Sequence, residues 1–263
     1  MADYHTRGEE IMETEYLKIA EQATKYKTVR NLMNCVNTKT LMAAHLRQSR
    51  KKAVGIDRMT KDEYEKNIEE NLENLVGRMK KFSYRPLPVR RTYIPKAGSD
   101  KKRPLGIPAY EDKLVQGVMA NVLTMVYEPK FMDLSYGFRP NRDCHKAIKA
   151  LDEIIIMKKT SFVVDADIKG FFDNVNHDWL IKFLEHDIED GNFSRYIKRI
   201  LKNGIMEEGK FLESDKSRMR ENRTYGSVRG SNGVKMLRKL STRPVLSSLA
   251  QEESKNVSDN KQK

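Results

Sequence analysis

The 263-residue sequence is short of cysteine and of long apolar runs. Its two cysteines, Cys35 and Cys144, are isolated, which excludes a disulfide framework and a thiolate zinc site. The longest uncharged apolar runs, such as residues 154–157, are far too short to span a bilayer, and the N-terminus has no basic-then-apolar signal pattern. These absences predict a soluble, cytoplasmic protein with no membrane partner.

Acidic residues are also in deficit. The 50 Lys and Arg residues outnumber the 37 Asp and Glu residues, which gives a formal net charge of +13. Basic surface gains affinity for nucleic acid by displacing counterions from phosphates. The last segment, residues 216–263, carries 12 basic and 4 acidic residues and little that it can bury, so we expect a basic tail that is largely disordered alone.

Apolar residues recur at helical spacing in four stretches, which predicts four helices that face a core. The stripes consist of Ile68, Leu72, Leu75, Val76 and Met79; of Leu114, Val118, Val122 and Met125; of Cys144, Ala147, Ile148, Leu151, Ile154 and Ile155; and of Leu180, Phe183, Leu184 and Ile188. Pro129 should end the second helix, and Asn176 or Asp178 should cap the fourth. Cys144 and Trp179 are interpreted as packing residues.

Between the first two helices, residues 85–108 are expected to form a hairpin, because prolines bracket short extended segments and "AGSD" supplies a turn. Nine basic residues and one acid, Asp100, lie between residues 80 and 103. The hairpin is either a solvated edge kept from aggregating by its charges or an arm that grips phosphates. The density of charge favours the arm, with Arg90, Arg91, Lys101 and Lys102 as its RNA-binding residues.

The stretch "SFVVDADIKGFFDNVNH", residues 161–177, begins with β-branched and aromatic residues. If residues 162–167 form a strand, alternation places Asp165 and Asp167 on one face at its end. Taken alone, this pattern favours surface acids that meet solvent or lysines.

The order of four segments changes that interpretation. "YIPKAGSDKKRPLGIP", "YEDKLVQGVM", "SYGFRPNRDCHKAI" and "VVDADIKGFFDNVNHDWL" follow one another as in the reverse transcriptases of bacterial group II introns, the intron maturases, which this sequence closely resembles over roughly residues 31–214. The resemblance implies an α+β, right-hand polymerase fold with fingers and part of a palm. It also implies a helical N-terminal extension over 1–50 and the fingers and partial palm over 51–215, which leaves a basic tail of unrecognised origin over 216–263.

The resemblance also assigns site residues. Asp167 matches the family's first metal-binding aspartate, with the carbonyl of Ile168 completing the ligation of two Mg²⁺ ions. Phe172 matches the gate that excludes a ribose 2′ hydroxyl, and Lys96 and Arg103 match the residues that hold the triphosphate of an incoming deoxynucleotide. "SYGFRP" has no expected catalytic role, and His177 is expected to help begin a helix.

The sequence departs from the family after Asp215, and no two aspartates are adjacent anywhere in it. The nearest substitutes, Glu207, Glu208, Glu213 and Asp215, lie in a glycine-containing turn segment for which we expect no strand-turn-strand pattern that presents a pair of carboxylates. An incomplete metal site loses most of its catalysis. Three alternatives follow: a polymerase completed by a second polypeptide, a non-catalytic RNA-binding fragment, or a degenerate product without selected activity.

Overall fold

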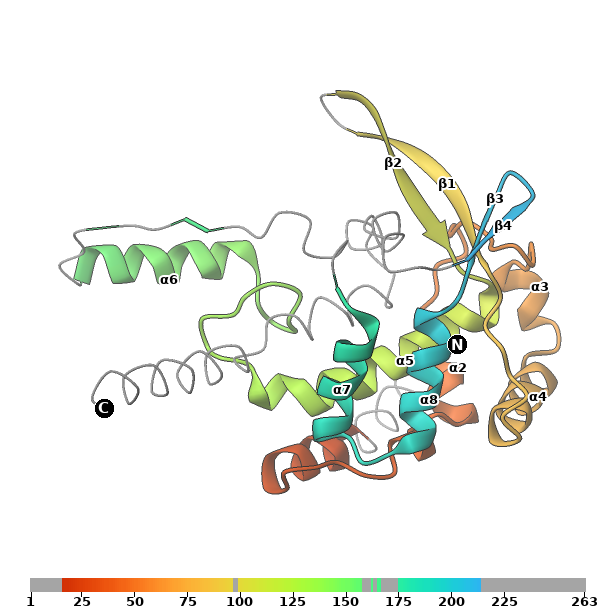
Figure 1. Cartoon of the computed structure of the whole chain (residues 1–263), viewed down its shortest axis with the longest axis horizontal. Coiled ribbons are helices and arrows are strands. Elements are labelled where there is room, and N and C mark those ends of the chain that lie inside the picture. Colours follow the sequence, from red (N-terminus) through yellow and green to blue (C-terminus); the bar gives the residue numbers. More distant parts are fainter. Residues whose placement is uncertain (1–15, 97–98, 158–161, 163–164, 167–174, 214–263) are drawn as a thin grey trace, which may run out of the picture.

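The computed structural model describes residues 16–96, 99–157, 162, 165–166 and 175–213 (Figure 1). Residues 16–25 are helical and precede the named elements. These are η1 (Leu32–Cys35), α2 (Thr38–Leu46), α3 (Lys61–Glu65), α4 (Ile68–Lys80), β1 (Val89–Lys96), β2 (Ser99–Ile107), α5 (Tyr110–Tyr127), η2 (Glu128–Lys130), α6 (Cys144–Met157), α7 (His177–Asp187), α8 (Gly191–Leu201), β3 (Ile205–Glu207) and β4 (Lys210–Leu212).

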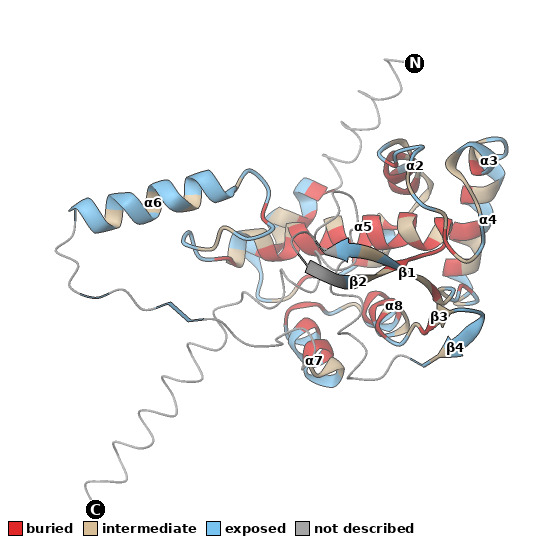
Figure 2. Cartoon of the chain, turned by 90° about the horizontal axis from the view of Figure 1, so that it is seen from above, coloured by how far each residue is buried: buried red, intermediate tan, exposed pale blue. Residues whose placement is uncertain are grey.

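Helix α5 forms the centre of the core. It has 18 residues, of which 14 are buried, because it is apolar on nearly all sides. One hydrophobic cluster joins it to α4, α7, α8 and the helical segments before residue 50 (Figure 2). The helices predicted at α4, α5 and α7 are confirmed, and Asn176 caps α7 by accepting hydrogen bonds from the backbone N–H groups of Asp178 and Trp179.

The sheet has four strands in the order β2-β1-β3-β4. The predicted hairpin is confirmed as antiparallel β1 and β2, with Arg90 opposite Ile107 and a register shift between Pro95 and Lys96. β1 pairs in parallel with β3 through Val89 and Ile205, so the short β3–β4 hairpin lies beside the base of the long one (Figure 1).

Near residue 207, where we expected no strand-turn-strand pattern that presents a pair of carboxylates, a short hairpin forms with Glu207 in its first strand and Glu208 in its turn. β3 and β4 pair antiparallel around Glu208 and Gly209, whose φ angles are 47° and 77°. A two-residue turn with both central residues at positive φ matches the twist of the flanking strands. Glutamate is an uncommon first residue for such a turn, which is why the sequence pattern did not reveal it.

The expectation that α6 faces a core was wrong. Its helix is confirmed, yet none of its residues is buried, and Ile148 and Leu151 are 57% and 51% exposed. Cys144 is exposed as well, and so is Trp179 on α7, so neither is a core residue. Figures 1 and 2 show α6 set apart from the helical body. Helical periodicity identifies an apolar face but does not supply the element that covers it.

The predicted aspartate strand is not seen at the positions that are described. Phe162, Asp165 and Ala166 are irregular and exposed, whereas residues 163, 164 and 167 lie outside the described residues. Among the helices of the described ranges, none is long and apolar enough to cross a membrane.

Candidate nucleic-acid interface

The two arginines at the base of the β1–β2 hairpin are engaged within the fold. Arg90 donates through Nε and Nη2 to the carbonyl of Val54, at 3.1 and 2.7 Å. The Arg91 side chain is 4% exposed, and its Nη1 lies 2.7 Å from Oε2 of Glu207. The Tyr93 hydroxyl donates to the other oxygen of the same carboxylate. Arg91 can therefore contact a phosphate only if its ion pair with Glu207 opens.

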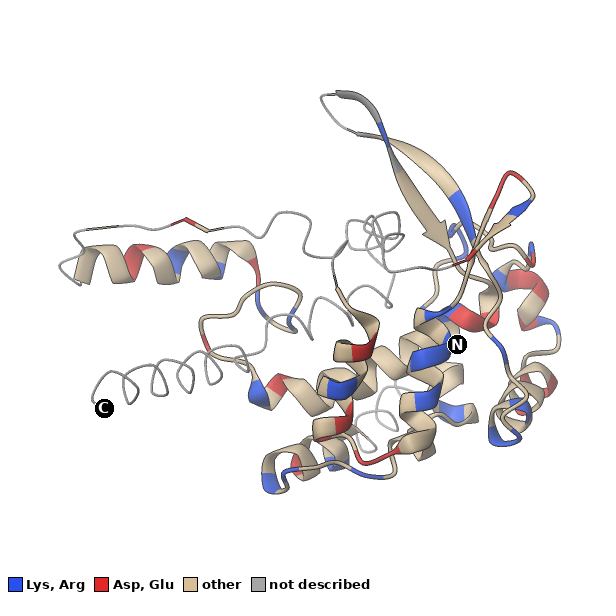
Figure 3. Ribbon diagram, viewed as in Figure 1, with Lys and Arg blue, Asp and Glu red and all other residues tan. Residues whose placement is uncertain are grey.

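Farther along the hairpin, the basic residues lie on the paired strands. Lys102 faces Pro95 across the hairpin and is exposed, and Arg103 lies opposite Ile94. Lys96 and Lys101 are also strand residues, but the side chains of Lys96, Lys101 and Arg103 fall outside what the structure describes. The hairpin projects away from the helical body, and its basic residues follow both strands (Figure 3).

A loop from the N-terminal half of the chain holds the start of α5. Asp57 accepts a hydrogen bond from the Tyr110 backbone N–H at 2.7 Å, and Lys113 donates to the carbonyl of Ala53 at 2.6 Å. Burial lowers the pKa of Lys113 to about 8. Gly55 lies against the backbone of Pro108, where a Cβ atom would come within 2.4 Å of the carbonyl oxygen. The loop thus fixes both α5 and the end of β2.

Glu111 and Asp112, which follow Tyr110 in α5, hold other segments by hydrogen bonds. Glu111 accepts hydrogen bonds from Nη2 of Arg78 at 2.7 Å. Asp112 accepts from the Tyr84 hydroxyl and, at 2.9 Å, from the Leu87 backbone N–H. Burial raises the pKa of Asp112 to about 6.

The four consecutive residues "YEDK" therefore tie together a loop, α4 and the approach to the hairpin. Sequence reasoning missed this role, although a polar run at the start of an otherwise apolar helix was a visible signal.

Arg139 of the "SYGFRP" segment is a structural residue. It is 8% exposed, and its Nε donates to Glu128 at 3.0 Å. Its Nη1 donates to the carbonyls of Met132 and Ser135 at 2.7 and 2.9 Å. These bonds fold the segment onto the end of α5.

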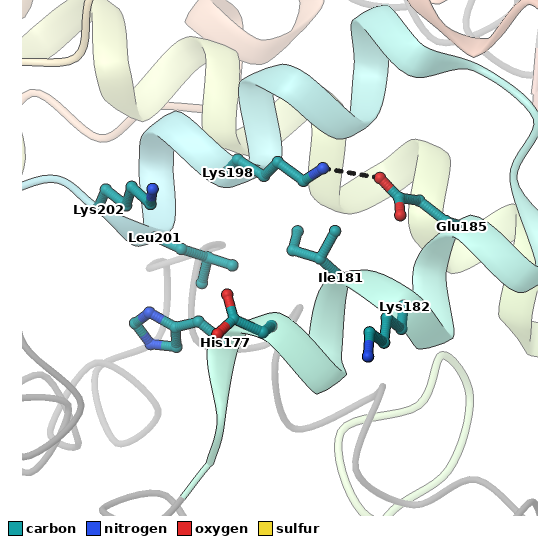
Figure 4. Close-up of a pocket in the computed structure, with 8 residues that line it drawn as sticks. His177, Ile181, Lys182, Glu185, Lys198, Leu201 and Lys202 are labelled. Carbon is teal, nitrogen blue, oxygen red and sulfur yellow. Dashed lines mark hydrogen bonds and ion pairs between the residues drawn. The ribbon is translucent and has the colours of Figure 1, made fainter.

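Sequence reasoning also missed an open pocket of about 360 Å³ between α7 and α8. Its lining consists of His177, Asp178, Ile181, Lys182, Glu185, Lys198, Leu201 and Lys202 (Figure 4). Its basic residues come from α7 and from the end of α8, which are separate segments of the sequence. No local motif therefore indicates the site.

The predicted metal and gate residues, Asp167, Ile168 and Phe172, lie outside the described residues. Within the described part of the chain, no three His, Cys, Asp or Glu side chains gather closely enough to hold a metal ion. The Mg²⁺ site implied by the resemblance therefore cannot be built from the described side chains.

In this chain a basic hairpin projects from a domain of mixed helices and strands. The model of the family "Reverse transcriptase (RNA-dependent DNA polymerase)" matches residues 94–236, more than half of the 263 residues. The chain belongs to this family, and its α+β fold is that of a reverse transcriptase.

Relatives of known name support the predicted resemblance. The group II intron-encoded protein LtrA of Lactococcus lactis subsp. cremoris is 41% identical over 143 residues, which are 54% of this chain and 24% of LtrA. Protein YkfC of Escherichia coli K12 is 35% identical over 160 residues, which are 60% of this chain and 42% of YkfC. The matched region thus spans less than half of either relative.

A solved structure is also similar, though distantly. A chain of the partial Cas6-RT-Cas1–Cas2 complex is 15% identical with a TM-score of 0.41, over 73% of this chain and 33% of that one. This likeness is too distant to inform the site.

Proposed function

We propose that this chain is the fingers and partial palm of a group II intron reverse transcriptase, over residues 51–215, and that by itself it binds RNA without copying it. The observation that carries the proposal is the projecting β1–β2 hairpin, whose basic residues extend beyond a firmly anchored base. Its support is the membership of the reverse transcriptase family and the likeness to intron-encoded proteins.

The contacts at the base divide the basic residues of the hairpin into two groups. Arg90 and Arg91 hold the hairpin to the loop before α3 and to β3. Lys102 is exposed and lies beyond these anchors. We therefore assign phosphate contacts first to Lys101 and Lys102, and we assign Arg90 and Arg91 mainly to orienting the arm, with RNA contact as a secondary role.

Polymerisation would need more than this chain supplies. Asp167, with the carbonyl of Ile168, would hold Mg²⁺, which activates a primer hydroxyl when it is bound. Lys96 and Arg103 would hold the triphosphate of a deoxynucleotide beside Phe172. The sequence has no adjacent aspartates, so a second polypeptide would have to complete the metal site. Without such a partner, the binding function remains.

The test is an anisotropy titration of the full chain with a labelled structured RNA at several salt concentrations. Lys101→Ser with Lys102→Ser should weaken binding and reduce the log-log salt slope by about 0.7 to 0.9 for each phosphate contact that is lost. Lys66→Ser with Lys81→Ser removes the same charge from exposed positions near α3 and α4, and it should change affinity little.

Salt-independent binding would contradict the electrostatic reading of the hairpin. Equal weakening by both pairs would show that only net charge matters. Arg90→Ser with Arg91→Ser should lower the free energy of unfolding as well as affinity, because these side chains hold the hairpin in place.

A further inference from the structure

The pocket between α7 and α8 differs from the hairpin in having an apolar floor between charged walls. Ile181 and Leu201 lie between the two helices, and charged side chains surround them (Figure 4). Three lysines line the pocket against two carboxylates, those of Asp178 and Glu185. Its chemistry is therefore that of a half-apolar groove with a small excess of positive charge.

Helix α8 divides its basic residues between two sides, and it contains no acid. Its arginines are used on the side of residues 82–84: Arg195 lies over the Phe82 ring at 4.8 Å, and Arg199 donates to the Tyr84 carbonyl at 2.9 Å. Lys198 and the C-cap residue Lys202, just after the helix, instead line the pocket. Packing against residues 82–84 thus explains the arginines but not the lysines.

Among the described residues, an acid pairs with one of the three pocket lysines. Lys198 lies 2.8 Å from Glu185, and this pair closes one side of the pocket (Figure 4). Of the residues that the structure describes, no carboxylate pairs with Lys182 or Lys202. Asp178 stands in the lining without a lysine or arginine partner among those residues, so it opposes an incoming anion.

Two exposed aromatic rings lie on α7 outside the pocket lining, and one of them, Trp179, contacts the pocket residue Lys182. Trp179 is 56% exposed, packs against Phe183 with ring centroids 5.9 Å apart and lies beneath the Lys182 ammonium at 4.6 Å. Phe183 is itself 37% exposed. Proteins that bind single strands combine lysines for the backbone with exposed rings on which bases stack. An acidic peptide would use the lysines but would leave these rings unexplained.

We propose that the α7–α8 groove binds single-stranded RNA, with backbone phosphates at Lys182 and Lys202 and a base against Trp179. The choice of RNA rests on the proposed function. The site itself rests on the pocket, on the two lysines that pair with no carboxylate among the described residues, and on the Trp179 ring beside Lys182. Phosphate contacts carry no sequence information, so the groove should accept any unpaired strand.

Trp179 is the only tryptophan of the chain, so its fluorescence reports on this site alone. The full chain is titrated with a labelled oligouridine of about 12 nucleotides, a length within the range that single-strand sites cover. Trp179 emission should be quenched, and Lys182→Ser with Lys202→Ser should reduce the anisotropy salt slope by about 1.4, the value for two single-strand phosphate contacts. Lys66→Ser with Lys149→Ser, matched in charge and exposure, should leave the slope near that of the parent.

The direction in which a second variant changes the affinity provides a further test. Asp178→Asn should tighten binding because it removes the unpaired carboxylate from the lining. Equal losses from the groove pair and the control pair, an unquenched Trp179 at saturation, or weaker binding by Asp178→Asn would each overturn the groove. Stronger binding of an acidic peptide than of the oligouridine would assign the groove to a protein instead.

Failure of the groove is distinguishable from failure of the proposed function. If RNA binding is weakened by Lys101→Ser with Lys102→Ser but not by Lys182→Ser with Lys202→Ser, only the groove proposal is contradicted. If the parent chain binds no RNA at all, both the groove proposal and the proposed function are contradicted. Far-UV circular dichroism of each variant checks that the fold is retained. Retention is expected because Lys102, Lys182, Lys202 and Asp178 are exposed.

Discussion

The guanidinium of Arg91 lies 2.7 Å from the carboxylate of Glu207, and this pair joins the β1–β2 hairpin to the β3–β4 hairpin. The parallel register between β1 and β3 consists of two residue pairs, Val89 with Ile205 and Arg90 with Met206. So short a ladder gives little stability alone. The ion pair, with Arg91 nearly buried, therefore helps to fix the angle at which the long hairpin leaves the body.

Glu207→Gln should destabilise the protein because it removes the carboxylate charge that lies beside the nearly buried Arg91 guanidinium. We expect a loss of about 1–3 kcal/mol in the free energy of unfolding, measured by urea denaturation. Glu208→Gln removes the same charge one residue later, in the turn, and should have a much smaller effect. Equal midpoints for the two variants would show that the Arg91 pair contributes nothing to stability.

Gly55→Ala should be destabilising although it adds a single methyl group. The new Cβ would meet the Pro108 carbonyl oxygen at 2.4 Å and the Ala109 Cα at 2.6 Å, both backbone atoms that cannot turn aside. Overpacking of this kind costs about 1–3 kcal/mol. Gly77→Ala, in α4 with nothing within 4 Å of its Cβ, should stabilise by up to about 1 kcal/mol. A urea midpoint for Gly55→Ala at or above that of the parent would contradict the close approach.

Two buried groups should make stability depend on pH with opposite signs. Burial raises the pKa of Asp112 from 3.8 to about 6, so its contribution is present at low pH and is lost as pH rises through 6. Burial, aided by the charge of Lys61, lowers the pKa of His45 from 6.5 to about 4, so its contribution is present above 6.5 and is lost as pH falls through 4. The two effects oppose each other between about pH 4 and 6, where both groups titrate.

Single substitutions should separate these effects. Asp112→Asn leaves His45, so the free energy of unfolding should rise with pH across this window. His45→Asn leaves Asp112, so the free energy of unfolding should fall with pH instead. Urea denaturation at half-unit pH steps measures both slopes, and slopes of the same sign in the two variants would contradict the assignment.

The exposed apolar face of α6 should make the chain self-associate. Ile148, Leu151 and Ile155 are 57%, 51% and 45% exposed along one helix, and exposed apolar patches favour association. Ile148→Lys should lower the association constant measured by sedimentation velocity across a concentration series. Glu153→Gln changes the net charge by the same amount on the same helix and should leave association unchanged. A monomeric parent chain at all concentrations would contradict this prediction.

Primer extension should be undetectable with the isolated chain, an RNA template, Mg²⁺ and deoxynucleotides. The metal ions need further carboxylates besides Asp167, and the sequence contains no two consecutive aspartates that could supply them. Gel analysis of a labelled primer measures this. Extension that Asp167→Ala abolishes would show that the chain supplies the missing ligands itself.

The sequence by itself determined the family and the local elements. Four motifs in order indicated a reverse transcriptase, and the family match confirms it. Apolar periodicity located α4, α5, α6 and α7, and prolines around a turn located the β1–β2 hairpin. These features are local, since spacing and turn chemistry within one segment decide them.

Only the tertiary structure decided which charges are available and which faces are covered. Arg90, Arg91 and Lys102 look alike in the sequence, yet Val54 and Glu207, distant in the chain, engage the two arginines while Lys102 stays exposed. The stripe of α6 predicts burial as strongly as that of α4, but none of its residues is buried. Partners of a charge or an apolar face come from remote segments, and sequence spacing carries no record of them.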